Sequence, residues 1–168
     1  TTQGFGIDAE YKKTDKKKWF IKCDSCGEWI HPDFFLHVIE EIEKGCWIVK
    51  DIDYTGMNEI RPICHICNKP YQRYKKGEWV AEFPERPVSG YQVSKMFSTM
   101  NTLNELVARF NDGLKNESIM QRCYNGDLGQ AYTAQGSKID SIILDSCIDT
   151  TYYMPDSTSH PSAYVSRI

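Results

Sequence analysis

The sequence lacks any long apolar run, and this absence limits the classes of protein to which it can belong. None of its hydrophobic stretches approaches the roughly 18 residues that a membrane-spanning helix needs. The chain also opens without the charged and apolar regions of a signal peptide. We therefore expect a protein of the cytoplasm.

The sequence also lacks an excess of one charge. Its 20 Lys and Arg residues against 23 Asp and Glu residues give a formal net charge of −3, so the total charge does not indicate a nucleic-acid binder. A local basic patch can still bind DNA, because a phosphate backbone contacts one part of the surface and not the total charge of the protein. At 168 residues, the chain suits one ordinary domain or a small metal-stabilised module with a helical partner.

The cysteines are not the even set that a secreted disulfide framework uses, because there are seven of them. Four form two C-x-x-C pairs, Cys23 with Cys26 and Cys64 with Cys67. Two intervening residues let both sulfurs of a pair turn toward one point, and Gly27 and Asn68 follow the pairs with residue types that tolerate a left-handed backbone. Four thiolates close a tetrahedral shell, so the sequence predicts a structural Zn2+ site in a zinc ribbon.

Alternatives to this site remain at the level of sequence. Iron in a rubredoxin-like site uses the same four ligands, although the second pair has Asn68 where a glycine is usual. His31 and His65 lie beside the pairs and could replace one cysteine, although we expect both to be surface imidazoles. The remaining cysteines are expected to be buried free thiols because they lie in apolar periodic settings: Cys46, Cys123 and Cys147.

The apolar periodicity predicts an α+β fold, in which a four-cysteine zinc ribbon of small antiparallel strands with an inserted helix precedes a short helical segment. Strands are expected over residues 18–22, 28–31, 46–52, 78–83 and 90–94. The inserted helix is expected over residues 33–44, because Phe34, Val38 and Ile42 recur every four residues and Gly45 can cap its end. Capped helices are expected to begin after Thr102, Asn116 and Ser137. The tryptophans are expected to pack around the ribbon: Trp19, Trp29, Trp47 and Trp79.

Composition and pattern divide the chain into four parts. We expect an N-terminal arm or linker over residues 1–17, the zinc-ribbon module over 18–97, a helical linker subdomain over 98–150, and a linker over 151–168 that leads toward a further domain. The first residue is not Met and both ends resemble cuts in a longer chain, so we expect a fragment.

Two basic stretches supply candidate contacts to DNA. Lysine binds phosphate as a point charge, and tyrosine can stack on or bond to the backbone. The alternative is an ordinary solvated face, because acidic residues partly balance the charge. The candidates are Lys12, Lys13, Lys16, Lys17, Lys18, Lys69, Tyr71, Arg73, Tyr74, Lys75 and Lys76.

The order of the motifs along the chain resembles the order found in a known protein family. A strand enters C-x-x-C-G-E at 19–28, a second C-x-x-C follows, and then come GEWVA at 77–81, GYQVS at 90–94 and NGDLG at 125–129 with Tyr132. This order resembles the lambda-type large terminase subunits of tailed phages, over roughly residues 5–150. In that family, a similar ribbon lies between an N-terminal ATPase and a C-terminal RNase H-like nuclease.

The resemblance implies a non-catalytic linker module of a DNA-packaging motor in the host cytoplasm. The chain has no G-x-x-x-x-G-K-[ST] phosphate loop, and it stops about where the first nuclease strand would begin. Asp140, Asp145 and Asp149 are interpreted as a solvated helix face and not as a two-metal site. The implied partners are double-stranded DNA, the other terminase domains or subunits, and the procapsid portal. The alternatives are a stand-alone zinc-ribbon DNA-binding protein and a rubredoxin-like electron carrier.

Overall fold

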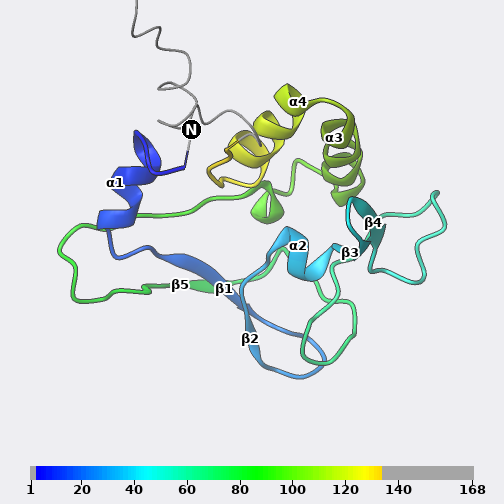
Figure 1. Cartoon of the computed structure of the whole chain (residues 1–168). Helices are drawn as coiled ribbons and strands as arrows, with labels where there is room; N and C mark the ends of the chain where they lie inside the picture. Colours follow the sequence, from blue (N-terminus) through cyan, green and yellow to red (C-terminus); the bar gives the residue numbers. More distant parts are fainter. Residues whose placement is uncertain (1–2, 134–168) are drawn as a thin grey trace, which may run out of the picture. The chain divides into compact units, whose positions relative to one another are not determined.

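A computed structural model describes residues 3–133, which belong to one compact unit. It has the expected α+β composition, with small antiparallel strands and several helices (Figure 1). The helix predicted after Ser137, the three aspartates at 140, 145 and 149, Cys147 and the linker over 151–168 lie outside the described residues. No helix in the described part is long and apolar enough to cross a bilayer.

The ribbon is built on a three-stranded antiparallel sheet. Strand β1 (Lys18–Lys22) lies between β2 (Trp29–Ile30) and β5 (Gly77–Val80), in the order β2-β1-β5. Trp19 lies opposite Trp79 in the register of β1 and β5. The prediction for 18–22 is confirmed, and those for 28–31 and 78–83 are confirmed as strands with other bounds, since β2 is shorter and β5 begins one residue earlier and ends three residues earlier.

The first part of the chain contains a helix that the sequence did not lead us to expect. Helix α1 (Ile7–Lys13) has Asp8 and Glu10 in its first turn and Lys12 in its last turn, an arrangement that complements the helix dipole. Seven residues make only two turns, too few to show an apolar repeat. The lack of periodicity over residues 1–17, which indicates an arm, is therefore also compatible with a short helix.

The segment between the cysteine pairs corrects a second expectation. Helix α2 (Phe34–His37) is only four residues long, and the chain then forms a hairpin of β3 (Ile39–Glu43) and β4 (Cys46–Val49). The helix predicted over 33–44 is therefore wrong beyond His37. Gly45, expected to cap that helix, has a φ of 81° in the hairpin turn. β-Branched residues dominate 38–42, and strand pairing outweighs their four-residue spacing.

The segment over 90–94 does not form the predicted strand. Within it, Tyr91 makes only an isolated parallel bridge to Lys17. Ser94 then caps the short 3-10 helix η1 (Lys95–Phe97) by accepting a hydrogen bond from the Met96 N–H. One bridge is enough to fix the path of this segment beside β1 without extending the sheet.

The C-terminal helices of the described part agree with the sequence. Helix α3 (Leu103–Lys115) begins at Thr102, whose hydroxyl accepts from the Glu105 N–H, as expected for a cap. Helix α4 (Glu117–Arg122) begins at Asn116, whose side chain accepts from two backbone N–H groups. A π-helical turn, η2 (Cys123–Asp127), follows.

The main apolar core joins these helices to the insert. Phe34 of α2 lies 5.6 Å from Phe110 of α3, measured between ring centroids, and Trp47 of β4 lies 5.3 Å from the same Phe110 ring. Trp47 therefore packs against the helices. The expectation that it packs around the ribbon is wrong. A second, smaller core lies under the ribbon and includes Ile21, Ile30 and the metal-site cysteines.

Candidate metal centre

The two cysteine pairs form knuckles with matching backbone hydrogen bonds. The N–H of Cys23 donates to the Glu28 carbonyl, and the N–H of Cys64 donates to the Lys69 carbonyl, both at 2.9 Å. In return, the N–H of Gly27 donates to the Cys23 carbonyl, and that of Asn68 to the Cys64 carbonyl. Each knuckle is thus a closed turn that positions its own two sulfurs.

The residue after each pair has the left-handed backbone that the sequence predicts. Gly27 has a φ of 74° and Asn68 a φ of 55°. Asn68 is one of only two described non-glycine residues with positive φ. Asparagine tolerates this region better than most residues, so the missing glycine of the second knuckle does not prevent its turn.

The fold brings the four sulfurs together although residues 27–63 separate the pairs. Cys23 Sγ lies 3.8 Å from Cys67 Sγ, and Cys26 Sγ lies 4.0 Å from Cys64 Sγ. All four sulfurs lie within 4.8 Å of one another. A tetrahedral site with metal–sulfur bonds of about 2.3 Å requires sulfurs ~3.8 Å apart. The arrangement therefore fits a metal ion held by four thiolates.

The electrostatics of the sulfurs also favour a cation. Although burial opposes ionisation, the backbone N–H groups of Cys26 and Ser25 lower the pKa of Cys23 to about 7. The N–H of Glu28 likewise favours the Cys26 thiolate, but burial and the three neighbouring sulfurs raise the pKa of Cys26 to about 12. Four thiolates this close repel one another unless a cation lies between them, and the thiolate is the form that binds metal.

Neither histidine beside the knuckles belongs to the ligand group. Among the described residues, the only metal-compatible cluster consists of the four cysteines. His31 Nδ1 lies 2.9 Å from the Trp19 carbonyl, and His65 Nδ1 lies 2.8 Å from His37 Nε2. His31 is half-buried, so of the two only His65 is the exposed imidazole that we expected.

The buried His37 lies beside this centre, and the sequence analysis missed it. It is 0% exposed, and its ring packs against Tyr71 of the ribbon core. Its carbonyl accepts from the Ile63 N–H, one residue before Cys64. The i,i+4 spacing of Asp33 and His37 was the available signal, since the Asp33 N–H donates to His37 Nδ1 at 3.0 Å.

The two described cysteines outside the metal-compatible cluster differ in burial. Cys123 is 1% exposed, as expected for a buried thiol. Cys46 is exposed, which corrects the expectation of burial, because it begins the edge strand β4 of a two-stranded hairpin. Neither belongs to the metal-compatible cluster.

Two of the candidate DNA contacts are buried. Tyr71 and Arg73 are each 4% exposed. The Arg73 guanidinium donates to the carbonyls of Lys95 and Ser98 at 3.2 and 3.1 Å. The prediction that these two side chains contact DNA is wrong, because both are buried in the interior and cannot contact a phosphate.

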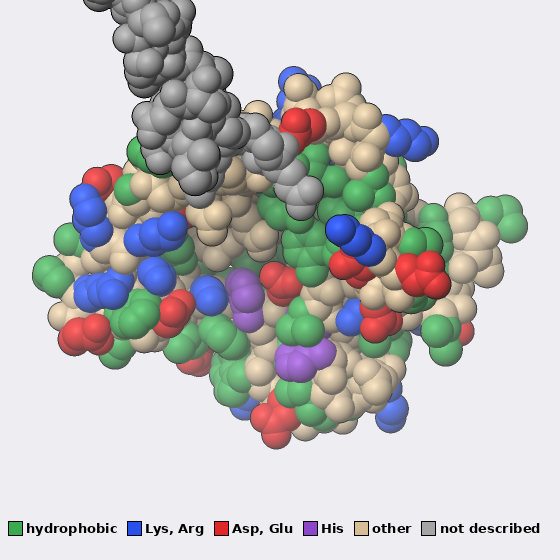
Figure 2. All heavy atoms as spheres, viewed as in Figure 1, with side chains coloured by type: hydrophobic (Ala, Val, Ile, Leu, Met, Phe, Trp, Pro, Cys, Tyr) green, Lys and Arg blue, Asp and Glu red, His purple; other side chains and the backbone are tan. Residues whose placement is uncertain are grey.

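Most of the candidate lysines are paired with carboxylates. Figure 2 shows Lys/Arg and Asp/Glu side chains interspersed over the part of the surface that carries α1 and β5. The ion pairs are Lys12 with Asp8, Lys13 with Glu10, Lys17 with Asp15, Lys18 with Glu82, and Lys75 with Asp24. Lys16 lies over the Phe83 ring. Within the described residues, Lys69 and Lys76 are exposed and form no ion pair, while Tyr74 is exposed at 44%.

Three glycines of the quoted motifs lie at close approaches between segments. A Cβ on Gly77 would collide with the Phe20 carbonyl, one on Gly90 with the Thr14 side chain, and one on Gly129 with the Val93 carbonyl. Gly129 also has a φ of 63°. These segments therefore pack against one another only because they carry glycine at these positions.

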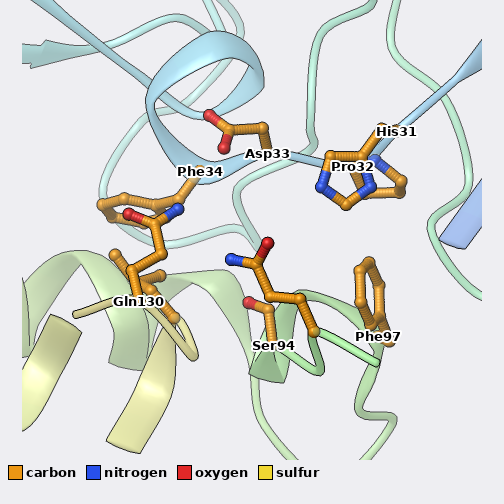
Figure 3. Close-up of a pocket in the computed structure, with 9 residues that line it drawn as sticks. His31, Pro32, Asp33, Phe34, Ser94, Phe97 and Gln130 are labelled. Carbon is orange, nitrogen blue, oxygen red and sulfur yellow. The ribbon is translucent and has the colours of Figure 1, made fainter. Parts of the chain in front are cut away.

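A small pocket near the ribbon brings together residue types known from catalytic triads. Figure 3 shows His31, Asp33 and Ser94 around a cavity of about 10 Å³. His31 Nδ1 is bonded to the Trp19 carbonyl, while the Ser94 hydroxyl donates to the Asp127 carbonyl. These groups form no serine–histidine–aspartate relay, and the cavity has room for about one water molecule.

Comparisons with known proteins add no relationship. No family model matches the chain, and neither a curated protein nor a solved structure matches it.

Proposed function

We propose that the four cysteines bind a structural Zn2+ ion and that the chain is the non-catalytic linker module of a phage terminase large subunit. The zinc part of this proposal rests on the sulfur spacing and on the all-cysteine donor set. A complete shell of four thiolates leaves no position for a substrate or a water molecule, so the ion would stabilise the fold. In such sites zinc contributes on the order of 10–16 kcal/mol of apparent binding free energy.

The terminase part rests on the order of the quoted motifs, and the packing of their glycines supports the interpretation that these motifs form one unit. Gly77, Gly90 and Gly129 come from three separate segments of the quoted order, and each lies where a side chain would not fit. This supports the interpretation of the motifs as parts of one structural module. In the proposed role, such a module holds the two neighbouring domains in register.

The proposed partners follow from this assignment. They are the ATPase and nuclease domains of the same protein or its partner subunits, the procapsid portal, and double-stranded DNA, all in the host cytoplasm. Lys69 and Lys76 are the best-placed candidates for a phosphate contact, since in the described part they alone of the candidate lysines are exposed without an ion pair or ring contact.

The open reading frame that encodes the chain tests the assignment. We expect a phosphate-loop ATPase upstream in the same frame, and downstream an RNase H-like nuclease whose first strand carries an aspartate. A frame that encodes neither would refute the terminase assignment and leave the metal site untouched. Metal analysis tests the site separately: we expect one colourless zinc per chain, and a red protein containing iron would overturn that part.

A further inference from the structure

A groove of about 620 Å³ beside the ribbon is lined mainly by aromatic and cationic side chains. Trp19 and Trp79 come from the paired strands β1 and β5, and Phe97 comes from η1. Tyr74, Lys75 and Lys76 come from the segment just before β5. None of the residues that line the groove is acidic.

Tyr74 is held rigidly although it is exposed. One face of its ring is covered by the Arg73 guanidinium, whose central carbon lies 4.1 Å from the ring centroid. Arg73 is itself fixed, since it donates to backbone carbonyls of the segment from Lys95 to Asn101. The Tyr74 hydroxyl also donates to the Asn101 carbonyl at 3.3 Å. The ring is thus fixed on one face and at its hydroxyl, and the residue as a whole is 44% exposed, which leaves room for a ligand.

Trp79 provides a second exposed ring in the same groove. It is 37% exposed, and it is held by Tyr91 and Phe97, whose rings lie nearly perpendicular to it at 5.0 and 6.5 Å. Trp19 packs against it at 5.4 Å from the neighbouring strand. Fixing these rings in the free protein lowers the entropy lost when a planar ligand stacks on them.

The charge of the groove complements a phosphate chain. Lys75 is paired with Asp24, but Lys76 is exposed and forms no ion pair with any described residue. Lys76 is adjacent in sequence to Lys75 and only two residues from the Tyr74 ring. A cation at this spacing can hold a backbone phosphate while the neighbouring ring takes a base.

From this arrangement we infer that the groove binds single-stranded nucleic acid, with bases stacked on Tyr74 and Trp79 and phosphate on Lys76. Exposed aromatic rings combined with lysines are the features by which proteins bind unpaired strands. A duplex cannot use the rings in this way, because its base faces are already stacked inside the helix. The inference goes beyond the proposed linker function and holds whether or not the module belongs to a packaging motor.

Fluorescence anisotropy of the full zinc-loaded chain tests this inference. The probes are labelled oligothymidylate and oligouridylate of about 20 nucleotides and a duplex of equal length, at about 50 mM salt. Tyr74→Ala should weaken single-strand binding about five- to a hundredfold, whereas Tyr74→Phe, which keeps the ring, should stay within about twofold. The two single strands distinguish DNA from RNA as the source of the ligand.

Two further variants separate binding from folding. Lys76→Glu alters an exposed side chain without an ion pair and so should leave the fold intact, yet it should weaken single-strand binding and reduce its salt dependence. Trp29→Ala is the matched control, since Trp29 is 42% exposed and pairs with Lys22, on the opposite face of the sheet from Trp19. It should leave binding unchanged.

Three results would overturn the inference. The first is no binding of either single strand at this salt concentration. The second is unchanged single-strand affinity in Tyr74→Ala or in Lys76→Glu. The third is a duplex that binds as tightly as the single strands while Tyr74→Ala weakens neither, which would show contact with the backbone alone. Zinc content, measured for every variant, would stay the same in each of these cases.

Discussion

His37 and His65 are joined by a hydrogen bond of 2.8 Å between Nε2 of the first and Nδ1 of the second. The Asp33 N–H donates to Nδ1 of His37, so the ring proton of neutral His37 must lie on Nε2 and point to His65. His65 follows the ligand Cys64 directly. The bond therefore ties α2 of the insert to the second knuckle.

We predict that His37 remains neutral down to unusually acid pH. Burial, followed by the neighbouring His65, lowers the pKa of His37 from 6.5 to about 4. The unfolded chain then binds more protons than the folded chain between these values, so stability is lost as the pH falls from 6.5 toward 4, by about 3 kcal/mol at most. Nitrogen and carbon NMR shifts of the ring should show the Nε2–H tautomer at neutral pH. Titration of His37 near 6.5 would contradict this.

We predict that Asp127 is a stabilising anion inside the helical part. Its side chain is 6% exposed, and its oxygens lie 2.5 Å from Lys95 Nζ and 2.9 Å from Arg109 Nε. Asp127→Asn should cost about 1–3 kcal/mol in urea unfolding, because both cations, which are about one-third exposed, lose their partner. Asp112→Asn removes an exposed carboxylate from α3 and is the control, for which we expect little change. Equal midpoints for the two variants would contradict the assignment.

We predict that any side chain at Gly129 destabilises the protein. Its φ of 63° and the approach of the Val93 carbonyl both exclude a side chain, so Gly129→Ala should destabilise the protein by about 1–3 kcal/mol. Gly126→Ala is a close control, since its added methyl group would meet no atom of another segment within 4 Å. Thermal unfolding of the two variants measures the difference. A Gly129→Ala protein as stable as Gly126→Ala would show that the NGDLG segment does not pack as described.

We predict that the two described free cysteines differ sharply in reactivity. Cys46 is exposed, whereas Cys123 is buried and its pKa is raised to about 11, chiefly by burial and then by Asp127. In a Cys147→Ser background, brief alkylation of the native zinc-loaded protein should label Cys46 and spare Cys123, because the thiolate is the reactive form. Peptide mass analysis measures this. Equal labelling of both residues would mean that the α4–η2 region opens readily.

Local features of this fold could be predicted from the sequence, and features that depend on distant partners could not. The knuckles and the caps at Thr102 and Asn116 depend on residues within a few positions, and all were predicted; the strand over 18–22 was also predicted, although its partner β5 lies about 60 positions away. The helix expected over 33–44 fails because Ile39 pairs with Val49 across a turn, and pairing of this kind is not encoded in a four-residue spacing.

Arg73 shows the same limit at the candidate site. Its neighbours in sequence are basic and aromatic, which made it a candidate for phosphate binding. The carbonyls that bind it come from residues 95–101, more than 20 positions away, and nothing in the local sequence indicates that they converge. Cys46 was misassigned for a related reason, since an apolar setting does not reveal that a strand lies at an edge.

The proposed metal site supports the whole ribbon, and the double variant Cys26→Ser, Cys67→Ser tests it most directly. Both residues are half-buried, so serine should disturb the packing little while removing two of the four ligands. We expect the wild-type chain to hold one zinc ion, and the variant to hold none and to unfold at a clearly lower temperature. A variant that binds no metal and melts at the wild-type temperature would contradict the account.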